Sequence, residues 1–78
     1  MSGAPAGGVR VYTFDTTHQA MWAEDLARDA GIPAEVIPAP PGVDAKCGLA
    51  LRTILARAEA LEAVLEKEGV PFTVATAS

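Results

Sequence analysis

Four short stretches of the chain are rich in apolar, β-branched or aromatic residues. They cover residues 9–14, 32–37, 48–53 and 70–74. Runs of this length and composition predict β-strands. Pro33 lies near the start of the second run and suits a strand entry or an edge strand, because proline has no N–H to donate to a neighbouring strand.

A helical period appears first between the first two predicted strands. Small residues recur on one face of residues 18–30, where they would let a helix lie close to a sheet; these residues are Ala20, Ala23, Ala27 and Ala30. Asp15, Thr16 and Thr17 precede this stretch as capping residues, and Gly31 follows it as a C-cap. The pattern predicts a helix from His18 to Ala30.

A second helix is predicted from Ile54 to Glu68, with Gly69 as its C-cap. Its buried stripe consists of Ile54, Ala58, Leu61 and Leu65. We expect the opposite face to be solvated, because it carries the charges of Glu59, Glu62, Glu66 and Lys67.

The resulting order β-α-β-β-α-β predicts an α+β fold of the ferredoxin-like split type. In that fold four strands form an antiparallel sheet and both helices cover one of its faces. The 78 residues suffice for one such domain, which we place at residues 9–76, after a disordered tail at residues 1–8.

Composition and charge narrow the function classes. The formal charge of -4, without a basic cluster, argues against a nucleic-acid partner. No apolar run approaches the ~18 residues of a membrane span, and the start of the chain lacks the features of a signal peptide. We therefore expect a cytoplasmic protein that binds neither nucleic acid nor membrane.

The single cysteine, Cys47, is the centre of the expected chemistry. It follows a proline-rich loop, residues 38–46, and the predicted topology places that loop at the same edge of the sheet as the start of the first helix. Lys46, Cys47 and Gly48 would then lie near Asp15, Thr16, Thr17 and His18. The partial positive charge of the helix start would favour a thiolate, the form that attacks electrophiles.

We assign each of these residues an expected role. Cys47 is a nucleophile or carrier, and Gly48 leaves room beside it for an incoming group. His18 and Lys46 add positive charge. The residues Asp15, Thr16 and Thr17 are caps that would also position an anion. The alternatives are a buried Cys47 that packs as a small apolar group and a solvated His18.

Metal and cofactor sites are not expected. One cysteine and one histidine supply too few ligands for a structural zinc site within one chain, although a site shared across a dimer stays open. Phosphate-loop, dinucleotide and C-x-x-C motifs are also absent from the sequence.

The chain resembles the short bacterial domains of the selenium or sulfur carrier protein-like family, over about residues 9–74. Four parts of the sequence carry the resemblance: T-F-x-x-T-H-x-A at residues 13–20, G-I-P at residues 31–33, the proline-bearing loop at residues 38–46 and C-G-L-A-L at residues 47–51. The resemblance implies a protein that holds selenium or sulfur on its cysteine as a persulfide-type adduct. Pro41 stands where family members often have a basic residue, and the C-P-x-P motif of other small sulfur carriers is absent.

Three functions follow from these observations. The leading one is a sulfur or selenium carrier, rather than a turnover enzyme, whose partners are donor and acceptor proteins. The second is a binding or regulatory module that dimerises through its sheet and uses no covalent chemistry. The third is a thiol-redox accessory domain. The sequence leaves open sulfur versus selenium, the identities of donor and acceptor, and whether the chain forms a homodimer.

Overall fold

The computed structural model describes residues 8–43 and 45–75. Residues 1–7 of the expected tail at residues 1–8, and the expected end of the domain at residue 76, lie outside the described residues. The predicted order β-α-β-β-α-β is confirmed. Its elements are β1 (Val9–Thr13), α1 (Thr17–Asp29), β2 (Ala34–Pro38), β3 (Leu49–Ile54), the 3-10 helix η2 (Leu55–Arg57), α2 (Ala58–Glu68) and β4 (Thr73–Ala75).

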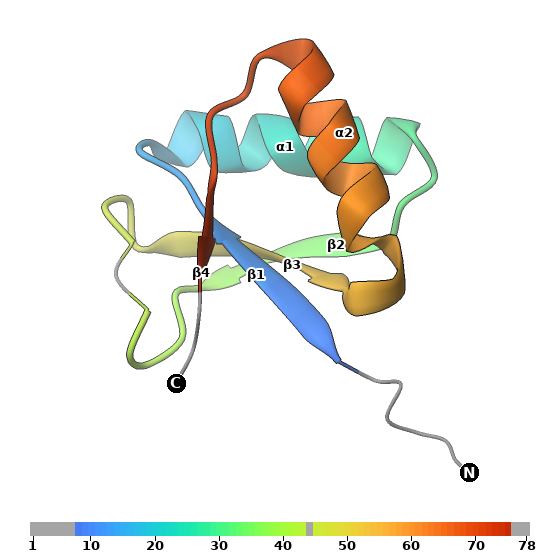
Figure 1. Ribbon diagram of the computed structural model, residues 1–78. Coiled ribbons are helices and arrows are strands. Elements are labelled where there is room, and N and C mark those ends of the chain that lie inside the picture. Colours follow the sequence, from blue (N-terminus) through green and yellow to red (C-terminus); the bar gives the residue numbers. More distant parts are fainter. Residues whose placement is uncertain (1–7, 44, 76–78) are drawn as a thin grey trace, which may run out of the picture.

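The four strands form one antiparallel sheet in the order β2-β3-β1-β4. Both helices lie on the same side of this sheet (Figure 1). The fold class is therefore the predicted α+β arrangement of ferredoxin-like type. Because β1 and β2 both pair antiparallel with β3, they run in the same direction. The start of α1 and the loop between β2 and β3 consequently share one edge of the sheet.

The core lies between the sheet and the helices. Its largest fully buried side chains are Tyr12, Leu51, Leu61 and Leu65. Three of the predicted alanines of α1, Ala20, Ala23 and Ala27, are buried as well. Their small side chains let α1 lie close to the strands, as the sequence pattern predicted. Ala30 is exposed, because it is the C-cap residue beyond the last helical turn.

The second helix begins four residues later than predicted. Ile54 is the last residue of β3, where it pairs with Val9 and is 46% exposed, so it is not part of the buried stripe. Leu55 N–H then donates to the Gly8 carbonyl oxygen at 2.8 Å, which keeps this segment beside β1. The pairing with β1 thus holds the chain extended through Ile54, and η2 makes the turn into α2. Ala58, Leu61 and Leu65 are buried as predicted.

Two strands begin later than predicted because their expected first residues are hydrogen-bonded to the end of the preceding helix. Ile32 N–H donates to the Ala27 carbonyl oxygen at 2.8 Å, and Val70 N–H donates to that of Leu65 at 2.9 Å. These bonds close the last turns of α1 and α2, and both Ile32 and Val70 are buried. Consequently, β2 begins at residue 34 rather than 32, and β4 begins at residue 73 rather than 70.

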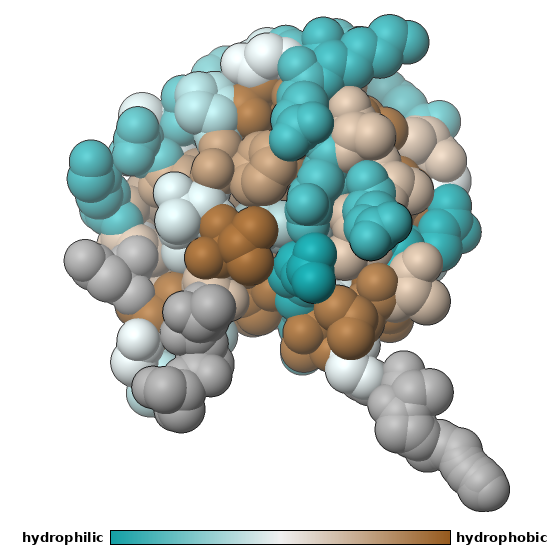
Figure 2. Space-filling view, in the orientation of Figure 1, coloured by the Kyte–Doolittle hydropathy of each residue, from teal (hydrophilic) through white to brown (hydrophobic). Residues whose placement is uncertain are grey.

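Most of the surface over α2 is polar, and apolar residues come to the surface in separate places (Figure 2). The exposed large apolar side chains are Val9, Met21, Trp22, Ile54, Leu55 and Val74. Among the described residues, neither helix has the length and apolar character needed to cross a membrane.

Candidate functional site

Cys47 lies in a tight turn immediately before β3. The Gly48 N–H donates to the Ala45 carbonyl oxygen at 3.1 Å, and the Gly48 carbonyl oxygen accepts from Ala39 N–H at 3.0 Å. Gly48 has a φ of +77°, a conformation that side-chain-bearing residues rarely adopt. The glycine therefore makes the turn, and its two hydrogen bonds fix the position of the preceding cysteine.

The thiol of Cys47 is half-buried. Its S–H donates to the Leu49 carbonyl oxygen, with the sulfur 3.5 Å from that oxygen. Cys47 is therefore not fully buried, and its reactivity stays a prediction. Since a thiolate has no proton to donate, ionisation would break the bond to Leu49 and free the sulfur to turn toward solvent.

An ion pair joins the cysteine turn to the start of α1. Lys46 Nζ lies 3.5 Å from Asp15 Oδ1, and both side chains are well exposed. This contact bears out the topological argument that brought residues 15–18 and 46–48 to one edge of the sheet. Because both side chains of the pair are exposed, the pair contributes little to stability.

Thr16 is the N-cap of α1, as the sequence suggested. Its hydroxyl oxygen accepts from the Gln19 backbone N–H at 3.1 Å, and the Gln19 side-chain oxygen accepts from Asp15 N–H at 3.2 Å. In a capping box the N-cap side chain accepts from the N3 backbone N–H, and the N3 side chain accepts from the N-cap N–H. Here the Gln19 side chain accepts instead from Asp15 N–H, one residue before the N-cap. These two bonds tie the segment between β1 and α1 to the first turn of the helix.

Thr17 and His18 form the exposed first turn of α1. Among the described residues, none of the hydrogen bonds or ion pairs joins either side chain to Cys47. The structure therefore brings Asp15 and Lys46 together, uses Thr16 as a cap, and leaves the roles of Thr17 and His18 as predictions.

Hollows in the described part of the chain show where ligands would have space: one of about 380 Å³ lies between the end of α1 and the start of β2, and two others lie at opposite ends of the strands. A small one, of about 60 Å³, lies at the cysteine edge of the sheet; it is lined by Thr13, Phe14, Asp15, Pro71, Phe72 and Thr73. The larger, of about 420 Å³, includes Val9 and Ile54 and so lies at the opposite ends of the strands. In the described part of the chain, no group of three His, Cys, Asp or Glu side chains is arranged to hold a metal ion.

A polar cluster between the sheet and α2 was missed by the sequence analysis. Glu62, predicted to be solvated, is half-buried, and its Oε2 accepts from Tyr12 Oη at 2.7 Å and from Arg10 Nη1 at 2.7 Å. The Tyr12 hydroxyl also lies 3.2 Å from the Ala58 carbonyl oxygen. Arg10 and Tyr12 are two positions apart on one strand, and this spacing was the signal that both face α2.

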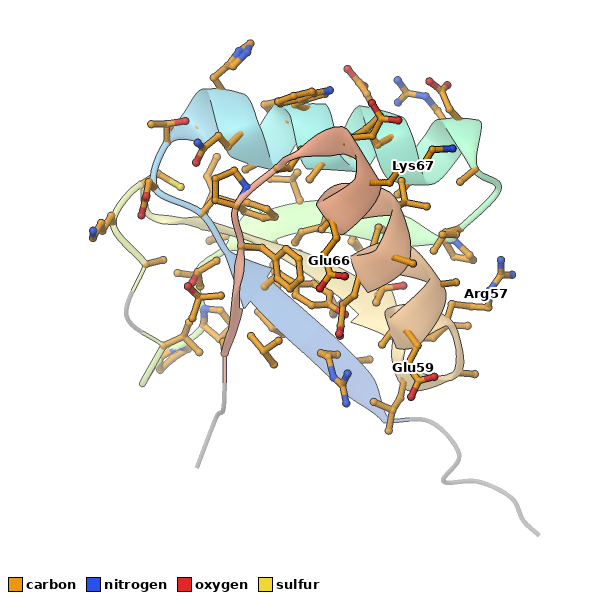
Figure 3. All side chains as sticks on the ribbon, turned by 45° about the horizontal axis from the view of Figure 1, so that its top comes forward. Arg57, Glu59, Glu66 and Lys67 are labelled. Carbon is orange, nitrogen blue, oxygen red and sulfur yellow. The ribbon has the colours of Figure 1, made fainter. Side chains whose placement is uncertain are left out.

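The cluster shifts the pKa of each member. The hydrogen bond from Tyr12, then that from Arg10, lower the pKa of Glu62 below its ordinary value. Burial, followed by the interaction with Glu62, raises the pKa of Tyr12. In contrast, Arg57, Glu59, Glu66 and Lys67 are exposed at or along α2, as predicted for the last three (Figure 3).

The model of the family described as "Putative Se/S carrier protein-like" matches residues 10–74. The chain belongs to this family. The match covers the Se/S carrier-like domain from β1 to β4, including the cysteine turn and the start of α1. It confirms the resemblance inferred from the sequence motifs. Neither the curated proteins nor the solved structures include a significant match.

Proposed function

We propose that this chain carries a sulfane sulfur or selenium atom on Cys47 and passes it to an acceptor protein. The observation that carries this proposal is the placement of Cys47 in the Gly48 turn at an edge of the sheet, with its thiol half-exposed. Membership of the Se/S carrier-like family supports it. The chain acts as a carrier and not as an enzyme that turns over a substrate alone.

Loading is an exchange at the terminal atom of a donor persulfide. Cys47 loses its proton to solvent, and the thiolate attacks the outer sulfur of a donor R–S–SH. The new S–S bond forms as the donor's S–S bond breaks, and R–S⁻ leaves and takes up a proton. The sum is R–S–SH plus Cys47–SH giving R–SH plus Cys47–S–SH, without a net oxidant or reductant. A donor R–S–SeH would load selenium in the same way.

The local structure suits this exchange in two respects. A methyl group built on Gly48 would meet no described atom within 4 Å outside residues 47–49, so the space around the Gly48 position of the turn is open. Lys46 supplies a cation adjacent in sequence to the cysteine, and its pairing with Asp15 moderates that charge. We expect both features to govern the rate of loading.

Delivery reverses the exchange. A thiol or other nucleophile of the acceptor attacks the outer atom of Cys47–S–SH, and the Cys47 thiolate leaves and recovers a proton. The partners are therefore a donor protein and an acceptor protein that each reach the cysteine edge. A reducing compartment such as the cytoplasm would keep the unloaded cysteine as a thiol.

The test is transfer to and from the intact chain. The reduced protein is incubated with glutathione persulfide and desalted, and its intact mass is measured by mass spectrometry. It is then treated with cyanide, which accepts sulfane sulfur. We expect a mass gain of one sulfur atom, its loss on cyanide treatment and an equal yield of thiocyanate. Cys47→Ser should gain nothing. Glutathione selenopersulfide tests selenium in the same assay.

A control in urea separates the fold's contribution from ordinary thiol chemistry. With one cysteine in the sequence, the unfolded chain offers the same thiol without the turn. The carrier proposal would be overturned if the persulfide formed no faster, and lasted no longer, in the folded chain than in the chain unfolded in urea. Mixed disulfide with glutathione as the main product would instead favour the thiol-redox reading.

A further inference from the structure

Three exposed aliphatic side chains gather at one corner of the sheet. Val9 and Ile54 are opposite each other on β1 and β3, and Leu55 follows Ile54 beside Gly8. Their exposed fractions are 52%, 46% and 47%. We call Val9, Ile54 and Leu55 the apolar corner. Apolar surface appears at this place in Figure 2, over the start of β1. Contiguous exposed apolar groups of this kind mark interaction surfaces more often than isolated ones do.

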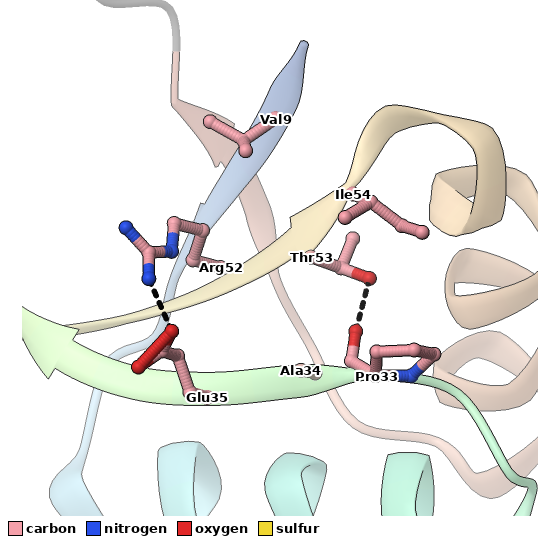
Figure 4. A pocket seen from close by; sticks show the side chains of 7 residues that line it. All are labelled: Val9, Pro33, Ala34, Glu35, Arg52, Thr53 and Ile54. Carbon is pink, nitrogen blue, oxygen red and sulfur yellow. Dashed lines mark hydrogen bonds and ion pairs between the residues drawn. The ribbon is translucent and has the colours of Figure 1, made fainter. Parts of the chain in front are cut away.

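A hollow adjoins the apolar corner. The space of about 420 Å³ is lined by Val9, Pro33, Ala34, Glu35, Arg52, Thr53 and Ile54 (Figure 4). Arg52 and Glu35 form an ion pair across β2 and β3 within this lining, and the Thr53 hydroxyl donates to the Pro33 carbonyl oxygen at 2.6 Å. Leu55 is beside the hollow and does not line it. The surface thus offers both a projecting side chain and a space that would receive one.

The side of the sheet away from the helices is nearly neutral. Side chains alternate along a strand, so the positions that do not face the helices are 9, 11 and 13 on β1, 35 and 37 on β2, 50, 52 and 54 on β3, and 73 and 75 on β4. We call this side the open face; Thr13 and Ala50, at its cysteine end, are buried, and its well-exposed strand residues include Val9, Glu35, Arg52 and Ile54. Its charged strand residues are Glu35 and Arg52, one of each sign.

The helices, in contrast, are strongly acidic. Helices α1 and α2 carry seven carboxylates against two basic side chains. Two copies that met through their helices would bring like charges together, whereas two open faces would not. Pairing along the β2 edge is also hindered, because Val36 N–H already donates to Glu24 Oε2 at 3.3 Å.

We propose that the open face and its apolar corner are the surface through which two copies of this chain associate. A two-fold axis would place Leu55 of each copy in the hollow of the other and Arg52 of each copy near Glu35 of the other. A self-complementary surface of this kind is what a two-fold dimer requires. Cys47 lies at the other ends of the strands, away from the apolar corner. The proposal is independent of the chemistry of Cys47.

The area of the open face sets how strong the association of two copies should be. Strands of five, five, six and three residues, spaced by about 4.8 Å, give a flat area of roughly 300 Å². A standard interface takes about 800 Å² from each partner, so even with the corner added the contact is small. We therefore expect a reversible dimer whose population rises with protein concentration.

Sedimentation equilibrium from low micromolar to millimolar concentration tests the proposal, in a reducing buffer and with Cys47→Ser so that no disulfide contributes. We expect the mean mass to rise from monomer toward dimer. Leu55→Glu and Arg52→Glu should each weaken association at least about tenfold, since each places an uncompensated carboxylate in the contact. Far-UV circular dichroism checks that each variant is folded.

Two further variants keep the test decisive. Combining Glu35→Arg with Arg52→Glu exchanges the two charges and should restore most of the association lost by Arg52→Glu alone. Met21→Glu alters a side chain of equal exposure to Ile54, 46%, on the helix side, and should leave association unchanged. A chain that is monomeric at every concentration, or whose dimer responds to Met21→Glu as much as to Leu55→Glu, would overturn the proposal.

Discussion

Lys46 Nζ lies 3.5 Å from Asp15 Oδ1, although 31 positions separate the two residues in the sequence. The contact links the residue before Cys47 to the residue before the N-cap of α1. Both side chains are mostly exposed, at 78% and 65%, so the ion pair is worth at most about 1 kcal/mol. Because Lys46 is next in sequence to Cys47, the one cysteine of the chain, changing this pair tests whether a nearby charge affects the reactivity of the thiol.

Changing one partner of this pair should alter the reactivity of Cys47 without unfolding the protein. Asp15→Asn leaves the Lys46 cation unpaired, so alkylation of Cys47 by iodoacetamide at fixed pH should become about two- to threefold faster. Lys46→Gln removes the cation and should slow the reaction by a similar factor. Stopped-flow alkylation at low salt measures both rates.

High salt is the control for this prediction. Because the effect is electrostatic and near the surface, the rates of the two variants should converge toward that of the natural chain at about 1 M salt. Rates that differ equally at low and high salt would mean that the variants act by moving the turn and not through charge.

Gly48→Ala should impair sulfur transfer beyond its effect on stability. Gly48 has a φ of +77° and open space around its Cβ position, so the cost of a methyl group there is the backbone strain of roughly 1–2 kcal/mol. Relieving that strain would shift the turn that holds Cys47. We expect a slower loading by glutathione persulfide, measured by intact mass against time.

Gly31 provides a matched control for that substitution. It has a φ of +73°, also with open space, but it ends α1 at the opposite edge from Cys47. Gly31→Ala should lose similar stability in urea unfolding and keep the natural loading rate. Equal loading defects in both variants would show that lowered stability, rather than the cysteine turn, causes the loss.

Element types were predictable from this sequence, but several boundaries were not. The residue patterns revealed both helices, all four strands and the shared edge of Asp15 and Lys46. They placed Ile54 in a helix because it continues the apolar stripe of Leu61 and Leu65. Its pairing with Val9, 45 positions earlier, keeps it in β3. Such a long-range pairing has no local signal.

The polar contacts inside the molecule were equally hidden from the sequence analysis. Glu62 is one of several acidic residues on α2, and nothing in its neighbours distinguishes it from Glu66 or Glu59. Only the packing of α2 over β1 brings its carboxylate to the Tyr12 hydroxyl. The thiol's bond to the Leu49 carbonyl oxygen likewise depends on the turn conformation and not on the residue types.

Glu62→Ala should destabilise the fold by about 1 to 2 kcal/mol, because it removes the closest partner of the buried Tyr12 hydroxyl. Alanine is a good helix former, so the change does not penalise α2 itself. Urea unfolding followed by circular dichroism measures the loss. Glu66→Ala, an exposed change on the same helix, should stay within about 0.5 kcal/mol of the natural chain.

The same cluster should limit stability at both ends of the pH scale. The pKa of Glu62 is lowered from its ordinary 4.5, so its contribution is complete above pH 4.5 and is lost as acid protonates the folded state. The pKa of Tyr12 is raised from its ordinary 10.0. Its contribution is complete below pH 10.0 and declines above it, because the unfolded chain then releases a proton that the folded chain retains. Urea unfolding at a series of pH values measures both the acid and the alkaline loss of stability, here called the acid limb and the alkaline limb.

Conservative variants assign each limb to its residue. Glu62→Gln cannot titrate, so the fall in stability below pH 4.5 should be shallower than in the natural chain. Tyr12→Phe should likewise make the loss of unfolding free energy above pH 10.0 shallower. The loss of unfolding free energy in acid should remain in this variant, since Arg10 still pairs with Glu62. Because Tyr12 is the sole tyrosine of the chain, no other phenol contributes to the alkaline limb. An alkaline limb that is unchanged in Tyr12→Phe would show that Tyr12 does not titrate with unfolding, and would refute the proposed coupling.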